Sequence, residues 1–158
     1  MTISSAFHIE LRSEAPKYRL SLPVYQKRTA AILKQLGLTK AELSLLFTTD
    51  PKIRVINRRH LNHDWATDVI SFPQIKVTRH KVTKSPANSY LGDIVISLDT
   101  AKRQAKEYGN SFDYELTFYI CHGILHLMGF DDHRRREFEE MDKLQKKILK
   151  KIGVESQD

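Results

Sequence analysis

The order of strand-like and helix-like segments constrains the fold of this chain more than any other feature of its sequence. Alternating or continuous apolar stretches indicate strands, and apolar residues that recur every three or four positions indicate helices. Strands are expected at residues 7–11, 42–48, 68–72 and 90–98, and helices at residues 20–36, 50–57, 99–108, 114–128 and 135–152. This order lacks the regular strand–helix alternation of a doubly wound fold. It predicts an α+β fold with a single mixed sheet packed with helices, in one domain spanning residues 1–158.

The predicted helices carry recognisable end signals. Asp50, Asp99 and Asp113 are expected to be N-caps, because a short side-chain oxygen can accept a hydrogen bond from the free amides of a first turn. Glycines that can end a helix stand at positions 37, 109, 129 and 153. The last helix is expected to bury one apolar stripe made of Phe138, Met141, Leu144, Ile148 and Ile152. Residues 74–89 are polar and basic and are expected to form the longest loop.

Charge and composition narrow the range of partners. The chain has 158 residues and a formal net charge of +7, from 26 Lys and Arg against 19 Asp and Glu. This excess favours an anionic partner, and RNA is the most common large one. The sequence begins without a basic segment followed by an apolar run, and no stretch is apolar enough to span a bilayer, so a cytoplasmic protein without a membrane partner is expected. Cys121 is the single cysteine and is expected to be a small buried residue.

The segment CHGILHLMGFDDH, residues 121–133, concentrates the candidate chemistry. His122 and His126 are four residues apart on a predicted helix, so they project from one face and can bind one tetrahedral ion. Gly129 can adopt left-handed backbone angles and turn the chain, which lets His133 supply a third ligand. Three protein ligands leave one position open for water, as in a catalytic zinc site. We therefore expect one divalent metal ion, Zn²⁺, bound by His122, His126 and His133.

The group that transfers protons is less well defined by the sequence. Zinc proteases carry a Glu directly after the first His, and Gly123 stands at that place, which counts against peptide hydrolysis. Asp131, Asp132 and Asp93 are the alternatives for proton transfer or for support of the ligands, although each also fits a turn or a cap. The catalytic candidates are His122, His126, Asp131 and Asp93.

Three motifs in the same order resemble those of the YbeY family of endoribonucleases. They are TDVISFP at residues 67–73, YLGDIVIS at residues 90–97 and HGILHLMGFDDH at residues 122–133. The resemblance extends from Ala41 to the last helix. It implies an α+β fold, a zinc or related divalent ion held by His122, His126 and His133, and cleavage of RNA phosphodiester bonds. It also implies a role in ribosomal RNA maturation, notably at the 3′ end of the small-subunit RNA, and in ribosome quality control.

The third ligand position departs from the family's pattern. The family usually has Gly-Tyr-Asp-His after the second His, whereas this chain reads GFDDH at residues 129–133. Asp132 therefore occupies the place where the third His usually falls. Either the turn is longer by one residue and His133 still binds, which we favour because a neutral imidazole suits zinc, or Asp132 binds the metal.

A second departure concerns the recognition of phosphate. Leu61 stands where many family members have Arg, whose planar fork would bind a phosphate in a bidentate manner. Arg54, Arg58 and Arg59 are close in sequence and are the candidates for RNA binding in its place. They also fit the solvated face of a helix.

The leading hypothesis is a single-strand-specific, metal-dependent endoribonuclease of rRNA maturation. Its expected partners are ribosomal RNA, the small ribosomal subunit and ribosome-assembly proteins. The alternative is a ribosome-assembly RNA-binding factor in which the metal is mainly structural and catalysis is weak or absent. A third class, a hydrolase of peptides or amides, is disfavoured by the basic charge and by Gly123.

Overall fold

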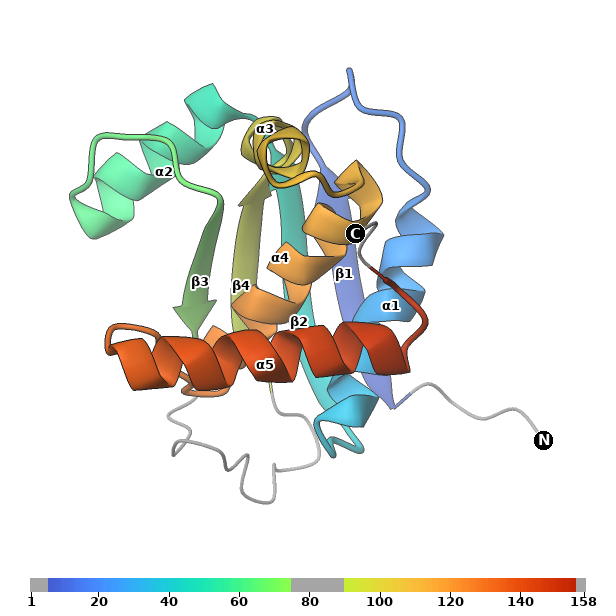
Figure 1. Cartoon of the computed structure of the whole chain (residues 1–158). Helices are drawn as coiled ribbons and strands as arrows, with labels where there is room; N and C mark the ends of the chain where they lie inside the picture. The colour runs from blue at the N-terminus through green and yellow to red at the C-terminus, as the bar shows by residue number, and fades with distance from the viewer. Residues whose placement is uncertain (1–5, 75–89, 156–158) are drawn as a thin grey trace.

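A four-stranded mixed sheet forms the centre of the molecule (Figure 1). The structure is a computed structural model that describes residues 6–74 and 90–155. The strands are β1 (Phe7–Ser13), β2 (Ala41–Thr48), β3 (Val69–Pro73) and β4 (Tyr90–Ser97), and they lie in the order β1-β2-β4-β3. Strands β1, β2 and β4 run parallel, and β3 pairs antiparallel with β4. The predicted α+β fold with one mixed sheet is confirmed.

Five helices pack around the sheet in the described part of the chain. They are α1 (Leu22–Gln35), α2 (Asp50–Leu61), α3 (Leu98–Tyr108), α4 (Phe112–Leu127) and α5 (Arg135–Lys151). Helix α1 packs against β1, and α4 packs against β3 and β4. Helix α5 crosses in front of this layer and contacts both α4 and α1 (Figure 1). Helix α2 packs with β3 and β4 on the opposite face of the sheet.

Strand β4 is nearly buried because it carries apolar residues on both faces, as expected for a strand inside a parallel region. Ile94 and Ile96 are fully buried in the larger core with α1, α4 and α5. Val95 points the other way and packs with Ile70 of β3 and Ile53 of α2 in a smaller cluster. Successive side chains of β4 point to opposite faces of the sheet, so those that alternate with Val95, such as Ile94 and Ile96, face α4.

Helix α4 approaches the sheet closely at Gly123. A Cβ atom at this position would lie 2.7 Å from Cγ2 of Ile94. No side chain fits there without a shift of the helix or the strand. The absence of a Glu after the first histidine therefore has a packing cause.

Three predicted N-caps are wrong by one or two residues. Ser97 and Ser111, rather than Asp99 and Asp113, occupy the N-cap positions, and each serine hydroxyl accepts a hydrogen bond from the backbone amide three residues later. The N-cap of α2 is Thr49, so Asp50 lies in the first turn. The Asp50 carboxylate accepts hydrogen bonds from Ser97, the N-cap of α3, and from Thr100 and Arg103 within α3. These bonds connect α2 to α3.

Other expectations have mixed outcomes. Cys121 is fully buried, as predicted. Phe138 was expected in the buried stripe of the last helix, but it is 54% exposed, because it lies near the start of α5 beside a cavity. The loop predicted at residues 74–89 lies outside the described residues except for Gln74. Among the described helices, none combines the length and apolar character needed to cross a membrane.

Candidate metal centre

Helix α4 and the turn after it position the two central histidines. The helix is capped at its start by Ser111 and ends where Gly129 adopts a left-handed conformation, with φ 90°. The Gly129 amide donates to the carbonyl of His126 at 3.1 Å, and the Phe130 amide donates to the carbonyl of Leu125 at 2.9 Å. These two bonds form a Schellman motif, which satisfies the last carbonyls of the helix and reverses the chain. The predicted glycine turn after His126 is confirmed.

His122 and His126 point at each other with their Nε2 atoms 3.0 Å apart. His122 Nδ1 lies 3.0 Å from Oε1 of Gln145 on α5, and His126 Nδ1 lies 3.0 Å from the carbonyl oxygen of Phe130. Both oxygens are acceptors, so each Nδ1 carries the proton and each Nε2 presents a lone pair. The two lone pairs are therefore directed at one shared point.

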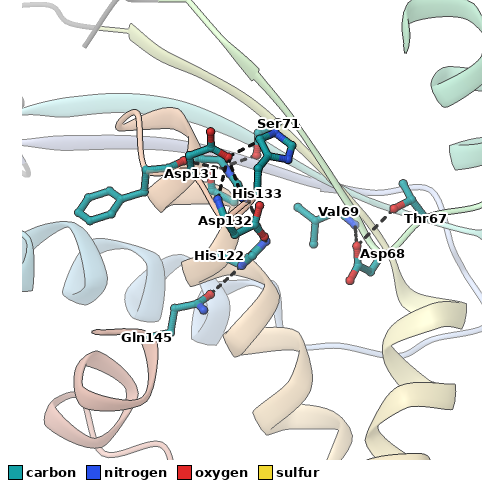
Figure 2. Close-up of polar contacts among 12 residues, drawn as sticks. Thr67, Asp68, Val69, Ser71, His122, Asp131, Asp132, His133 and Gln145 are labelled. Carbon is teal, nitrogen blue, oxygen red and sulfur yellow. Dashed lines mark hydrogen bonds and ion pairs between the residues drawn. The ribbon is translucent and has the colours of Figure 1, made fainter. Parts of the chain in front are cut away.

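Asp132 completes this group (Figure 2). Its Oδ2 atom lies 3.6 Å from Nε2 of His122 and 3.8 Å from Nε2 of His126. The three side chains are partly buried, with exposed fractions between 24% and 29%. Two imidazole nitrogens and a carboxylate oxygen, all within 4.8 Å of one another, could hold one metal ion.

The donor set fits a divalent cation on chemical grounds. Two lone pairs at 3.0 Å repel each other unless a cation or a proton lies between them. Burial lowers the pKa of His126, and the neighbouring His122 lowers it further, so the neutral form that binds metals is favoured. The Asp132 carboxylate adds the negative charge that such an ion requires. Two histidines and one carboxylate are typical ligands of catalytic zinc and of non-haem iron.

His133 lies further from the two helical histidines. Its imidazole is 86% exposed, and its Nε2 atom lies 3.3 Å from Oδ1 of Asp131. Asp131, Asp132 and His133 form a second group whose potential ligand atoms lie within 4.8 Å of one another. The structure therefore places Asp132, and not His133, with His122 and His126. The assignment of His133 as third ligand stays a prediction, and the geometry favours its alternative.

The two aspartates proposed for catalysis take different places. Asp131 Oδ1 accepts hydrogen bonds from the amides of Asp132 and His133, at 2.7 and 3.2 Å, so Asp131 shapes the turn beside the group (Figure 2). Asp93 directly precedes Ile94, which packs against α4 at Gly123. The Asp93 side chain therefore points to the opposite face of the sheet, away from α4. Its carboxylate accepts hydrogen bonds from Ser44 and Tyr90. The structure does not bring Asp93 to the histidines.

The three predicted RNA-binding arginines lie on α2, across the sheet from α4. Arg54 Nε is 3.0 Å from Asp64 Oδ1, and the same oxygen lies 3.8 Å from Arg58. Arg59 is exposed. The structure leaves these cations at the surface and does not place them with the histidines. Leu61, at the end of α2, is 43% exposed.

Sequence reasoning missed Gln145 and Glu115. Gln145 is 3% exposed and holds His122, although a glutamine on a charged helix suggests a solvated residue. Its spacing of four from Met141 and three from Ile148 places it on the buried stripe, which is a signal that could have identified it. Glu115 is 4% exposed and was hidden among the acidic residues expected in a first helical turn.

A cavity of about 930 Å³ borders this centre. His122 and Asp132 lie at its lining, and Glu115 and Phe138 line it as well. The candidate metal centre is therefore accessible from solvent and has room beside it for a substrate larger than water.

Comparisons with known proteins identify the family that this sequence matches. The family model described as Endoribonuclease YbeY matches residues 11–153. A protein named Endoribonuclease YbeY from Anaeromyxobacter dehalogenans is 40% identical over 92% of this chain and 72% of its own length. One of the same name from Heliobacterium modesticaldum is 37% identical over 90% of each chain. A third, from Myxococcus xanthus, is 45% identical over 78% of this chain. That protein is longer, and the aligned part covers 41% of its length.

A solved structure supports the fold. The solution structure of TM1509 from Thermotoga maritima superposes with a TM-score of 0.59 over 92% of this chain and 91% of that one, at 21% sequence identity. This likeness concerns the fold alone. The family match covers the five helices, the histidine segment and all of the sheet except the first four residues of β1. The chain therefore belongs to the YbeY family of endoribonucleases, as its motifs predicted.

Proposed function

We propose that this chain is a metal-dependent endoribonuclease that cleaves single-stranded RNA in the cytoplasm. The observation that carries the proposal is the convergence of His122 Nε2, His126 Nε2 and an Asp132 oxygen beside an open cavity. The family membership and the names of the relatives support a nuclease. The formal charge of +7 supports a polyanionic substrate.

The roles of the residues follow from their contacts. His122, His126 and Asp132 would hold the ion, which we propose to be Zn²⁺. When bound, a divalent ion supplies polarisation of a phosphoryl oxygen and lowers the pKa of a water molecule. Gln145 and the Phe130 carbonyl keep a proton on each Nδ1 and hold both rings in place. Asp131 fixes the turn that presents Asp132.

We infer that the biological substrate is ribosomal RNA, with maturation of the small-subunit RNA 3′ end and ribosome quality control as the processes served. Exposed cations on α2, Arg54, Arg58 and Arg59, are proposed to contact RNA phosphates outside the catalytic cleft. Because each phosphate contact releases counterions, binding should weaken steeply as salt rises. The small ribosomal subunit and assembly proteins are the proposed partners.

One observation favours a second candidate, an assembly factor that binds RNA without cleaving it. Leu61 places an exposed apolar side chain where many family members have Arg, and Arg54 and Arg58 are both near Asp64. A metal held by His122, His126 and Asp132 would then stabilise the fold alone.

The deciding experiment is cleavage of labelled RNA by zinc-loaded protein. The substrates are a precursor fragment spanning the 3′ end of small-subunit rRNA, an unstructured RNA, and the same RNA annealed into a duplex. We expect cleavage of the unpaired RNAs, no cleavage of the duplex, and a discrete cut in the precursor. The double variant His122→Ala/His126→Ala should be inactive, whereas His8→Ala, which removes an exposed imidazole from β1, should cleave like wild type.

Two results would change the conclusion. If folded, zinc-loaded wild type binds the precursor but leaves every RNA intact, the assembly-factor function is favoured. If the double histidine variant cleaves as well as wild type, the activity comes from a contaminant or from another site.

A further inference from the structure

The cavity beside the histidines continues along α4 as a groove. Its floor is formed by α4, where Phe118 and His122 are partly buried and the Glu115 side chain is almost fully buried. One wall comes from the end of α3 and from Asp68, just before β3, and the other comes from α5. At about 930 Å³ the groove is within the size range of small-ligand sites. It can hold more of a substrate than a single phosphate group.

The charge of the groove indicates what part of an RNA would enter it. Besides Asp132, which is assigned to the ion, four carboxylates line it, from Asp68, Glu115, Asp142 and Glu155, against two lysines, Lys146 and Lys150. The groove is thus acidic on a protein whose net charge is +7. Phosphates would be repelled from the acidic floor, whereas neutral groups that carry N–H donors would be attracted. A nucleobase is such a group.

Two carboxylates in the groove retain unused acceptor capacity. Glu115 Oε1 accepts a hydrogen bond from Asn110 Nδ2 at 2.8 Å, and Asp68 Oδ1 accepts from the amide of Val69 at 2.7 Å and from the Thr67 hydroxyl at 3.3 Å. No donor from the described residues reaches Glu115 Oε2 or Asp68 Oδ2. Burial raises the pKa of Glu115, and the charge of Asp68 raises it further despite the Asn110 bond. A ligand that donates hydrogen bonds to both carboxylates would reduce the repulsion between Glu115 and Asp68.

Aromatic rings at the rim provide surfaces on which a base can stack. Tyr108 on α3 is 60% exposed, and Phe138 on α5 is 54% exposed, although both are large apolar side chains. Both line the groove, together with the partly buried Phe118. Exposed aromatic residues are the usual stacking partners of unpaired bases in proteins that bind single-stranded RNA.

We propose that this groove is a base-binding subsite that receives one unpaired guanine next to the scissile phosphate, stacked on the exposed rings with its donor edge on Glu115 and Asp68. The inference rests on the proposed ribonuclease function. Guanine is selected because it presents two adjacent donors, N1–H and N2–H₂, to a carboxylate. Adenine and cytosine each pair one amino donor with a ring nitrogen acceptor, and uracil places its single N–H between two carbonyl oxygens. A carboxylate repels these acceptors.

The test measures binding separately from cleavage. Zinc-loaded wild type is titrated into four fluorescently labelled five-nucleotide RNAs with nuclease-resistant phosphorothioate linkages, which are uridine throughout except for G, A, C or U at the centre, and anisotropy is recorded. We expect the guanine RNA to bind about 10-fold tighter or more than the others. Glu115→Gln keeps the shape and the Asn110 contact but presents an amide donor, so the preference should fall below about 3-fold.

Two further variants control for charge and stacking. Glu107→Gln removes a negative charge from the exposed face of α3 outside the groove and should leave the preference for guanine intact. Phe138→Ala should weaken binding of all four RNAs to a similar degree, because stacking is tolerant of sequence. Circular dichroism and thermal unfolding of each variant confirm that it is folded.

The outcomes separate this subsite from the proposed function. Equal binding of the four RNAs to wild type, or an unchanged guanine preference in Glu115→Gln, overturns the subsite. Cleavage of single-stranded RNA without any base preference would overturn the subsite and leave the ribonuclease function standing. A guanine preference that depends on Glu115, in a protein that cleaves nothing, would support the subsite and overturn the ribonuclease function.

Discussion

Asp132 Oδ2 lies 3.6 Å from Nε2 of His122, whereas the imidazole of His133 points to Asp131 and is 86% exposed. The carboxylate thus takes the place nearest the two helical histidines. We predict that Asp132→Ala lowers zinc affinity by more than the about 10- to 100-fold typical of losing an outer-shell partner, because it removes a ligand. Competition with a fluorescent zinc chelator measures this affinity.

Two matched variants make the ligand assignment decisive. Asp132→His restores an imidazole where the family usually has one and should bind zinc strongly. His133→Ala should retain zinc, since its side chain lies outside the group formed by His122, His126 and Asp132. Loss of zinc from His133→Ala together with retention by Asp132→Ala would show that the turn rearranges on binding and that His133 is the third ligand.

Gln145 is predicted to position His122 for the ion. Its Oε1 atom accepts the Nδ1 proton of that ring, and the glutamine is 3% exposed. Gln145→Leu keeps the volume but leaves the N–H without a buried acceptor, which should lower zinc affinity about 10- to 100-fold. The same chelator competition measures the change, and Gln145→Glu, which retains an acceptor, should lose less. Equal loss in both variants would indicate that α5 packing, rather than the hydrogen bond, governs affinity.

Gly123 is predicted to tolerate no side chain. A Cβ atom there would lie 2.7 Å from Cγ2 of Ile94, so Gly123→Ala should lower the free energy of unfolding by about 1–3 kcal/mol through overpacking. Urea denaturation measures the loss. In a double-mutant cycle, Gly123→Ala combined with Ile94→Ala should cost less than the sum of the single variants, because truncating Ile94 removes the colliding methyl. Strict additivity would show that the clash is relieved elsewhere.

Glu115 is predicted to make stability depend on pH in a definite direction. Burial raises the pKa of this carboxyl above its ordinary value of 4.5. Its contribution to stability is therefore fully present below about pH 4.5 and is lost as the pH rises through the higher pKa of the folded state. Glu115→Gln, which cannot ionise, should be more stable than wild type at neutral pH, with an advantage that disappears near pH 4. Urea denaturation at both pH values tests this, and an advantage that is equal at both would contradict it.

The sequence predicted the elements of this fold well because their apolar periods are strong. Helix α5 and strand β4 lie within two residues of their expected bounds. The caps were less predictable, because Ser97 and Ser111 each stand two residues before an aspartate and both residue types favour N-caps. Which serine or aspartate takes the cap depends on where the preceding strand or turn delivers the chain.

The candidate site was predictable in part. The spacing of His122 and His126, followed by Gly129, specified one helical face and one turn. The face to which Asp93 points was not predictable, because β4 is apolar on both sides and its alternation carries no signal. The choice between Asp132 and His133 depends on the rotation of the chain after Gly129, which the Schellman bonds determine and residue spacing does not.

The hydrogen bond from His122 to Gln145 connects α4 to α5. An ion that binds only when α5 is docked on α4 stabilises the docked state. The free energy of this stabilisation grows with the logarithm of the ion concentration divided by its dissociation constant. Metal supply would then set how firmly the last helix is docked. When the ion is scarce, α5 would detach more often and expose Met141 and Ile148, which are buried in the docked state, so this helix would become more accessible to proteases.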